Sequence, residues 1–335
     1  MSPNLPSGFK LQSIVRDCWK TDKLLTVAVL SHAIALPLLL IACVIDPVQI
    51  GGMNGWFKPV RFAISGAIYG ATFIWLMRYV DGWPRMRWIA SNVTGVALIV
   101  ETTLIAVQVI RRTTSHFNIT DATNATIYGT MGQFIFLVSL MNLVLVALLI
   151  FQMAGKPVSG EGSVFAWSLR LGALSSFVFG MGGGFLMTAG PTPAQYELVK
   201  ETGNMPYVGA HSVGVPDGGP GLPLLGWSTE GGDLRIGHFV GLHGMQILPV
   251  VGWLLSTFWA RDLWSERQRL SLVWITSIGY MGVAAILVWQ ALRGQPLLQP
   301  DSMTLIASAV LAGAVALSGL KIMVGPGASA DAVRA

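Results

Sequence analysis

Residues 232–249 read GDLRIGHFVGLHGMQILP and combine ionisable side chains with the apolar composition of a membrane-spanning helix. Histidine, arginine and glutamine can transfer protons, bind metals or hold anions. At about 100° per residue, four of them fall on one helix face: Arg235, His238, His243 and Gln246. Asp233 precedes them at the position of a helix N-cap. Because polar groups that face lipid are costly, we expect this face to point into the protein.

Two other segments carry similar polar stripes. In NGWFKPVRFAISGAIYGAT, five polar side chains share about 80° of helix face: Lys58, Arg61, Ser65, Tyr69 and Thr72. In ETTLIAVQVIRRTTSHFN, one face is shared by Glu101, Gln108 and Arg112. At 1.5 Å per residue, Glu101 and His243 both lie about 13–15 Å below the same surface. The stripes predict one buried polar site between three helices, and the alternative is a hydrogen-bond network that only holds helices together.

Glu101 is the strongest candidate for proton handling. A carboxyl group near mid-membrane has to be neutralised, either by a proton or by a cation such as Lys58, Arg61 or Arg235. The predicted catalytic residues are Glu101, His243 and Gln246. The predicted ligand-binding residues are Lys58, Arg61, Tyr69, Gln108, Arg111, Arg112, Asn118 and Arg235.

The histidines offer a candidate cofactor site. His238 and His243 are five residues apart, so they cannot hold one ion in the usual i, i+4 manner, and each needs a partner from another segment. The predicted metal ligands are therefore His116, His238 and His243. Such a set suits a divalent metal with an open position for water. A haem b held by a pair of histidines is an alternative, and histidines without any cofactor are another, so the cofactor stays open.

Two histidines are expected to lie outside this site. His32 lies in the first apolar run, where a polar contact between helices is the simplest interpretation. His211 lies in a long Gly/Pro-rich loop and is expected to be exposed. Arg170 lies one to two turns inside the fifth apolar run, and we expect it to extend to the membrane surface.

The composition identifies the elements that must position these residues. The 335 residues are 53% hydrophobic and 11% charged, against about 25% charged in soluble proteins. Eight apolar runs have the length of a spanning helix: roughly 24–45, 59–80, 88–110, 127–151, 164–189, 234–258, 268–292 and 302–324. We predict an all-α, polytopic integral membrane protein, an eight-helix transmembrane bundle forming one domain over 24–324. A tail over 1–23 precedes it, and a disordered tail over 325–335 follows.

One connection is long enough to cover the site. Residues 190–232 contain 10 Gly and 6 Pro, which excludes a spanning helix, and long loops of this kind are often lids or binding loops.

Basic residues predict the orientation. If both termini are cytoplasmic, the inner segments hold 14 Lys and Arg and the outer segments hold 7, as the positive-inside rule favours. The net charge of +5 therefore reflects topology, and we expect no nucleic-acid partner. The predicted location is the inner membrane of a bacterium, with the polar site facing the periplasm.

Three functions fit these residues. The favoured hypothesis is a haem- or metal-dependent membrane enzyme or redox protein that acts on an anionic or lipid-like ligand. The alternatives are a proton-coupled carrier of a small anion or amphiphile, and a non-catalytic sensor or assembly factor. The chain has no G-x-S-x-G, H-E-x-x-H or C-x-x-C motif, which removes the simplest hydrolase and redox signatures. The expected partners are the lipid bilayer and an anionic lipid or small anion, and the oligomeric state is left open.

Overall fold

The protein is an all-α, multi-pass membrane protein, as the sequence predicts. A computed structural model describes residues 11–152 and 162–325. Eight segments in these ranges are long and apolar enough to cross a membrane. They are α2 (Lys23–Ile45), α3 (Phe57–Met77), α4 (Pro84–Ile110), α5 (Ala122–Gln152), the continuous segment Ser163–Met187, α9 (Leu234–Ser256), α11 (Glu266–Leu292) and α12 (Ser302–Val324). The parts of the predicted tails at 1–10 and 326–335 lie outside the described residues.

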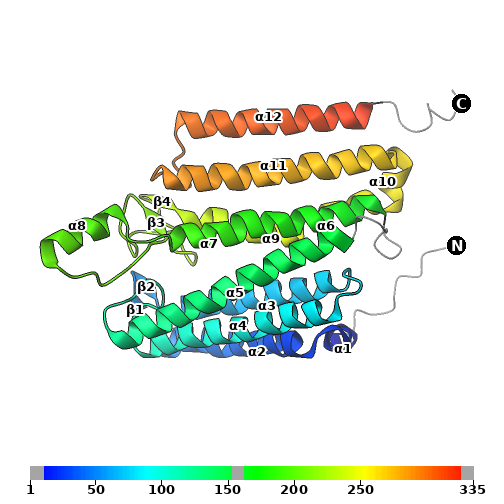
Figure 1. The fold of residues 1–335 in the computed structure, drawn as a ribbon. Helices are drawn as coiled ribbons and strands as arrows, with labels where there is room; N and C mark the ends of the chain where they lie inside the picture. Colours follow the sequence, from blue (N-terminus) through cyan, green and yellow to red (C-terminus); the bar gives the residue numbers. More distant parts are fainter. Residues whose placement is uncertain (1–10, 153–161, 326–335) are drawn as a thin grey trace, which may run out of the picture.

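Short elements gather at the two ends of the bundle (Figure 1). One end carries β1 (Gln49–Ile50), β2 (Met53–Asn54), α8 (Pro193–Thr202), β3 (Ser212–Val213) and β4 (Gly232–Asp233). We call it the cap end, because residues 188–233 fold over the helix ends there. The other end carries α1 (Leu11–Thr21) and α10 (Phe258–Leu263), and the described chain begins and ends there.

The spanning segments form two groups of four, which lie one above the other in Figure 1. The first group is α2–α5, and the second is Ser163–Met187 with α9, α11 and α12. Helix α5 packs against the second group and joins the two. Phe73, Leu145, Leu169 and Met245 belong to one buried core that crosses this boundary. Apolar packing therefore holds the groups together on one side.

The fifth spanning segment is not a uniform α-helix. It runs as α6 (Ser163–Ser175), a π-helical turn η1 (Ser176–Met181) and α7 (Gly182–Met187). Such π turns are rare and are frequently found at functional sites. Glycines bring this segment against α9: a Cβ added to Gly241 would lie 2.4 Å from the backbone nitrogen of Gly180. The two backbones are therefore in direct contact.

This contact makes a stability prediction. Gly241→Ala is expected to lower the free energy of unfolding by about 1–3 kcal/mol, because the new methyl group forces two packed backbones apart. The matched control is Gly313→Ala on α12, where an added Cβ meets nothing within 4 Å. Alanine is the better helix former, so the control is expected to be as stable as wild type or slightly more stable. Thermal unfolding in detergent compares them, and equal midpoints for the two variants would contradict the packing described here.

Arg170 corrects one expectation. Its side chain does not extend to the membrane surface and is only 8% exposed. Its Nε donates to the Leu149 carbonyl on α5, and its guanidinium lies 4.5 Å above the centre of the Trp167 ring. A carbonyl and an aromatic face inside the protein replace the water that this cation would otherwise seek.

The cap joins the two groups of helices. Strands β3 and β4 pair antiparallel, so Ser212 lies opposite Asp233 at the start of α9. The β1–β2 turn meets the long loop at glycines, since a Cβ added to Gly52 would lie 2.5 Å from the Gly218 carbonyl oxygen. Asp233 accepts a hydrogen bond from the Arg235 N–H, which confirms the predicted N-cap.

Candidate functional site

Glu101 is buried on α4 beneath the cap. It is 2% exposed, and neither carboxyl oxygen has a hydrogen-bond partner in the described chain. The nearest ionisable group is the His116 ring, whose Nε2 lies 3.6 Å from Oε1. An ionised carboxylate in an apolar environment without hydrogen bonds is strongly disfavoured. Glu101 is therefore placed to gain and lose a proton next to a histidine.

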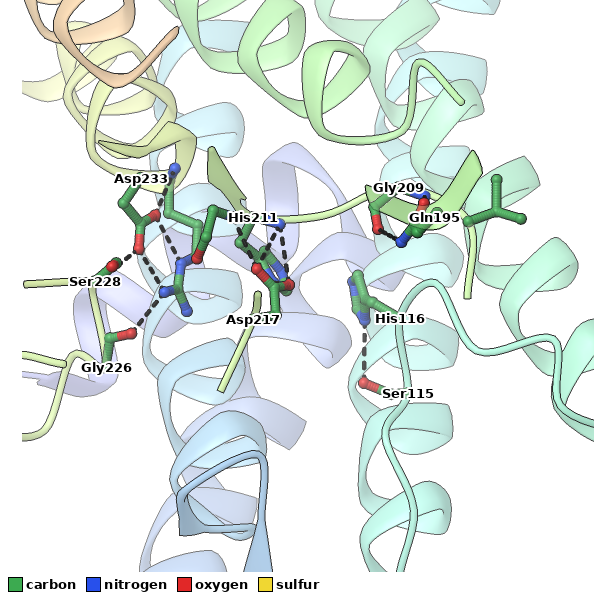
Figure 2. A network of polar contacts seen from close by, with 12 residues as sticks. Ser115, His116, Gln195, Gly209, His211, Asp217, Gly226, Ser228 and Asp233 are labelled. Atoms are coloured by element: carbon green, nitrogen blue, oxygen red, sulfur yellow. Dashed lines mark hydrogen bonds and ion pairs between the residues drawn. The ribbon is translucent and has the colours of Figure 1, made fainter. Parts of the chain in front are cut away.

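His116 links Glu101 to the loop that follows α4, and Figure 2 shows its ring joined to Ser115. Its Nδ1 lies 3.0 Å from the Ser115 hydroxyl, and the ring packs against Phe62 with ring centres 5.8 Å apart. The His211 ring lies beside it, with the ring centres 6.2 Å apart and the ring planes tilted by 36°. Burial, with the positive charges of Lys58 and His211, lowers the pKa of His116 well below its usual range. The ring is therefore neutral at neutral pH and able to accept a proton.

His211 and Asp217 form the outer end of this series. His211 Nδ1 lies 2.7 Å from an Asp217 oxygen, and the carboxylate also accepts from the backbone N–H groups of His211 and Ser212. Burial alone would raise the pKa of Asp217, but these hydrogen bonds and the His211 charge lower it. Asp217 is therefore ionised in the folded protein. His211 is half-buried in this network and is not simply exposed, which corrects the expectation from the sequence.

Three cations surround these groups. Lys58, at the start of α3, is close enough to interact electrostatically with Glu101, Asp217, Arg61 and Arg235. No carboxylate of the described chain forms an ion pair with Lys58 or Arg61, whereas Arg235 is paired with Asp233. Two cations without acidic partners make this an attractive position for an anion.

Arg61 and Arg235 hold one turn of the cap. Arg61 donates to the Leu225 carbonyl, and Arg235 donates to the Gly226 carbonyl at 2.6 Å. Arg61 lies on α3 and Arg235 on α9, so the turn bridges the two groups of helices. The turn needs left-handed backbone at Leu224 and Gly226, with φ of 63° at both. Glycine adopts this conformation at little cost, which explains why a glycine occupies position 226.

Deeper in the membrane, polar side chains follow the boundary between the groups. Gln246 on α9 donates to the Thr72 hydroxyl on α3 at 2.9 Å. Asn142 on α5 donates to the Tyr69 hydroxyl and to the Ser176 hydroxyl, at 3.1 and 3.4 Å. The Asn142 carbonyl oxygen has no hydrogen-bond partner in the described residues. The predicted stripes of α3 and α9 therefore meet, and α5 adds to them.

His243 contradicts the predicted helix face. It is exposed on the outside of the bundle, and its ring is near Gln246, with Nδ1 3.3 Å from Oε1. Ile236 on α9 is buried beside α11. On a helical wheel, His243 lies at one edge of the polar face of α9. The centre of that face is covered by neighbouring helices, whereas this edge is not.

The predicted three-histidine metal site is not assembled. Within residues 11–152 and 162–325, no three His, Cys, Asp or Glu side chains are arranged to hold a metal ion. His116 contacts Glu101 and Ser115, His238 contacts the Gly180 carbonyl through Nδ1, and His243 contacts Gln246. Each ring has its own neighbours. His116, His238 and His243 therefore do not form the predicted three-histidine ion site.

The remaining predicted ligand residues have partners of their own around the start of α5, where Gln108 and Asn118 are buried. Gln108 donates to Asn124 at 2.8 Å, and exposed Arg111 lies 3.5 Å from the same oxygen. Arg112 forms an ion pair with Asp46. Asn118 organises the 113–120 turn by bonding to Thr113 and Thr120. His32 lies 2.9 Å from Thr102 on α4, the helix–helix contact expected for it.

Sequence reasoning missed Asn142, Asn124, His211 and Asp217. Asn142 had a usable signal, because it is a strongly polar residue inside the apolar run 127–151. Asp217 had none, since PDGG reads as an ordinary turn.

The Asp217 contacts make a second prediction. Asp217→Asn removes the negative charge that three hydrogen-bond donors share, so we expect the cap to detach locally. Charge-assisted hydrogen bonds contribute about 1.5–3 kcal/mol each when buried, and the partial exposure of Asp217 places the loss at the lower end. Hydrogen exchange of residues 205–233 should accelerate about tenfold, while Glu230→Gln on the same loop leaves it unchanged. Equal exchange in the two variants would show that the pair does not secure the cap.

Comparisons with known proteins give no relative for this site. No protein-family model, no curated protein and no solved structure matches the chain.

Proposed function

We propose that the protein is a proton-coupled carrier, which takes an anion next to Lys58 and a proton on Glu101. The observation that carries this proposal is the buried carboxyl of Glu101, whose oxygens have no hydrogen-bond partner in the described residues and which lies 3.6 Å from His116. A structural salt bridge would place a cation within contact distance of Glu101. In the described chain the ionisable side chain in contact with Glu101 is His116, and no ion pair includes Lys58.

Electrostatics couples the two binding events. An anion that arrives beside Lys58 brings negative charge close to Glu101 and offsets the attraction of the lysine. A neighbouring negative charge favours the protonated form of a carboxyl group. Anion binding therefore promotes proton uptake, and by linkage a proton on Glu101 strengthens anion binding to the same degree.

The surroundings provide a route for the proton. The His211–Asp217 pair lies beside His116, whose Nε2 lies 3.6 Å from Glu101, and His116 is neutral at neutral pH and can accept a proton. General acid–base groups of this kind typically accelerate proton transfer by about 10²–10⁴.

Transport suits the architecture better than metal-dependent catalysis. Carriers often place their site between two bundles that move against each other. Here Lys58 and Arg235 lie on different groups of helices, and Thr72–Gln246 and Tyr69–Asn142 continue the polar boundary into the membrane. The metal-dependent alternative loses support because its three histidines have separate neighbours.

We also propose an orientation with the cap outside and both termini cytoplasmic, in a bacterial inner membrane. Among the described residues, the end opposite the cap has 10 basic residues (Arg16, Lys20, Lys23, Arg78, Arg85, Arg87, Arg261, Arg267, Arg269, Lys321) and 5 acidic ones (Asp17, Asp22, Asp81, Asp262, Glu266). An excess of basic residues on one side is typical of the cytoplasmic face.

Proteoliposomes test the function. Vesicles with an internal pH dye receive external chloride, nitrate, phosphate, methanesulfonate or decanesulfonate, the last two because sulfonates stay ionised and do not cross as neutral acids. At least one of these anions should acidify the lumen, and Glu101→Gln should abolish the signal. The matched control is Glu197→Gln, an exposed acid on α8. The proposal fails if no anion in the panel acidifies the lumen, or if Glu101→Gln behaves like Glu197→Gln.

A further inference from the structure

We infer that the anion is the head group of a single-chain amphiphile, which reaches Lys58 from the bilayer along the outward face shared by α3 and α9. This inference rests on the proposed function and names its substrate class. Polar side chains on both helices point outward within the membrane-spanning segments.

His243 and Ser65 are both exposed on spanning helices. His243 lies nine residues into α9, about 13 Å along the helix axis. The described chain gives the His243 ring one hydrogen-bond neighbour, Gln246. Polar and ionisable side chains that face hydrocarbon are costly and usually mark a pathway. A ligand with polar atoms at this depth would supply the missing partner.

Apolar side chains accompany these polar groups. Ile64 and Ile68 on α3 are 42% and 41% exposed, and Ile247 and Val250 on α9 are 44% and 54% exposed. The Gln246–Thr72 hydrogen bond fixes where the two helices meet. The shared face is therefore an apolar strip that His243 and Ser65 interrupt. Its apolar residues suit the acyl chain of an amphiphile, and the two polar residues suit its head group as it moves along the strip.

Charge identifies the head group. The polar stripe of α3 ends at Lys58 and Arg61, in the first turn of the helix, where the helix dipole adds positive potential. Neither cation has an acidic partner in the described residues, whereas Arg235 is neutralised by Asp233. The face thus runs from an apolar strip to a cationic end. From residue 58 to residue 72 it covers about 21 Å, enough for one extended acyl chain.

Chain length tests this inference. Decanesulfonate and methanesulfonate carry the same head group, so the proposed anion site treats their charges alike. In wild-type proteoliposomes we expect decanesulfonate to drive lumen acidification at a concentration at least about tenfold lower, because its chain partitions into the membrane and binds the strip. Equal potency, with Glu101 dependence retained, overturns the inference and leaves the proposed function standing. Loss of Glu101 dependence for both overturns the function itself.

Two variants distinguish binding of decanesulfonate to the strip from its general partitioning into the membrane. Ile68→Trp fills the face and His243→Leu removes its polar group, and each should weaken decanesulfonate at least about fivefold without changing methanesulfonate. The matched control is Ile306→Trp on α12, a residue that is 63% exposed and lies on another face. Equal effects of Ile68→Trp and Ile306→Trp contradict the inference. If Ile68→Trp changes only the mass of the oligomer, the face is an interface between two copies of this protein, and the inference is overturned.

Discussion

Lys58→Met is expected to abolish proton-coupled anion uptake in proteoliposomes. Lys58 is the cation that interacts with both Glu101 and Asp217, and it has no ion pair in the described residues. Removing one partner of a desolvated charge pair typically costs about 2–5 kcal/mol, which corresponds to at least about 30-fold weaker anion binding. The measurement is the anion concentration that gives half-maximal acidification of the lumen.

Two further variants serve as controls for Lys58→Met. Lys200→Met on α8 removes an exposed lysine, whose ion pair with Glu197 contributes little, and should behave like wild type. Lys58→Arg keeps the charge and should retain part of the activity, with altered preference among the anions because a guanidinium is planar and binds in a fork. If Lys58→Met transports as well as Lys200→Met, the anion does not bind where we place it.

His116→Phe should slow proton-coupled uptake by about 10², while leaving decanesulfonate affinity nearly unchanged. Phenylalanine preserves the packing against Phe62 and Phe117 but removes the nitrogen that lies 3.6 Å from Glu101. A purely structural role for His116 would instead reduce affinity and stability together. External imidazole should restore part of the rate in this variant, because it can re-supply the proton carrier.

The dependence of the transport rate on external pH tests the protonation state of His116. Burial and the nearby charges of Lys58 and His211 lower the pKa of His116, so acidification protonates the ring only well below its usual range. The wild-type rate should therefore hold as the external pH falls through the usual histidine range, and then decline. A decline centred on the usual histidine value would contradict the environment described for His116.

The fold was predictable because it depends mainly on patterns along the sequence. Eight apolar runs of spanning length require helices that satisfy their own backbone hydrogen bonds, so the all-α bundle followed directly. The Asp233 cap and the His32 contact were equally local and were confirmed. The π turn at 176–181 was not predictable, because no residue type encodes an extra residue in one turn.

The site was predictable only in part, because a polar stripe gives the direction of a side chain and not its neighbour. Periodicity brought Thr72 and Gln246 to one boundary correctly. It placed His243 inside, whereas α9 leaves that edge of its polar arc uncovered. Arg170 was misplaced for a similar reason, since the Leu149 carbonyl and the Trp167 ring that hold it come from tertiary packing. The His211–Asp217 pair depends on how a glycine-rich loop folds back, which hydropathy does not report.

The most direct test of the coupling between proton and anion is infrared difference spectroscopy of the carboxyl band of Glu101 in reconstituted protein. We expect a protonated carboxyl signal that increases when decanesulfonate is added, is absent from Glu101→Gln and is retained in Glu197→Gln. In Lys58→Met the signal should be present without the anion and should no longer respond to it, because the cation that links the two is gone. A carboxyl signal from Glu101 that does not change with the anion in wild-type protein would contradict the coupling of proton and anion on which the account depends.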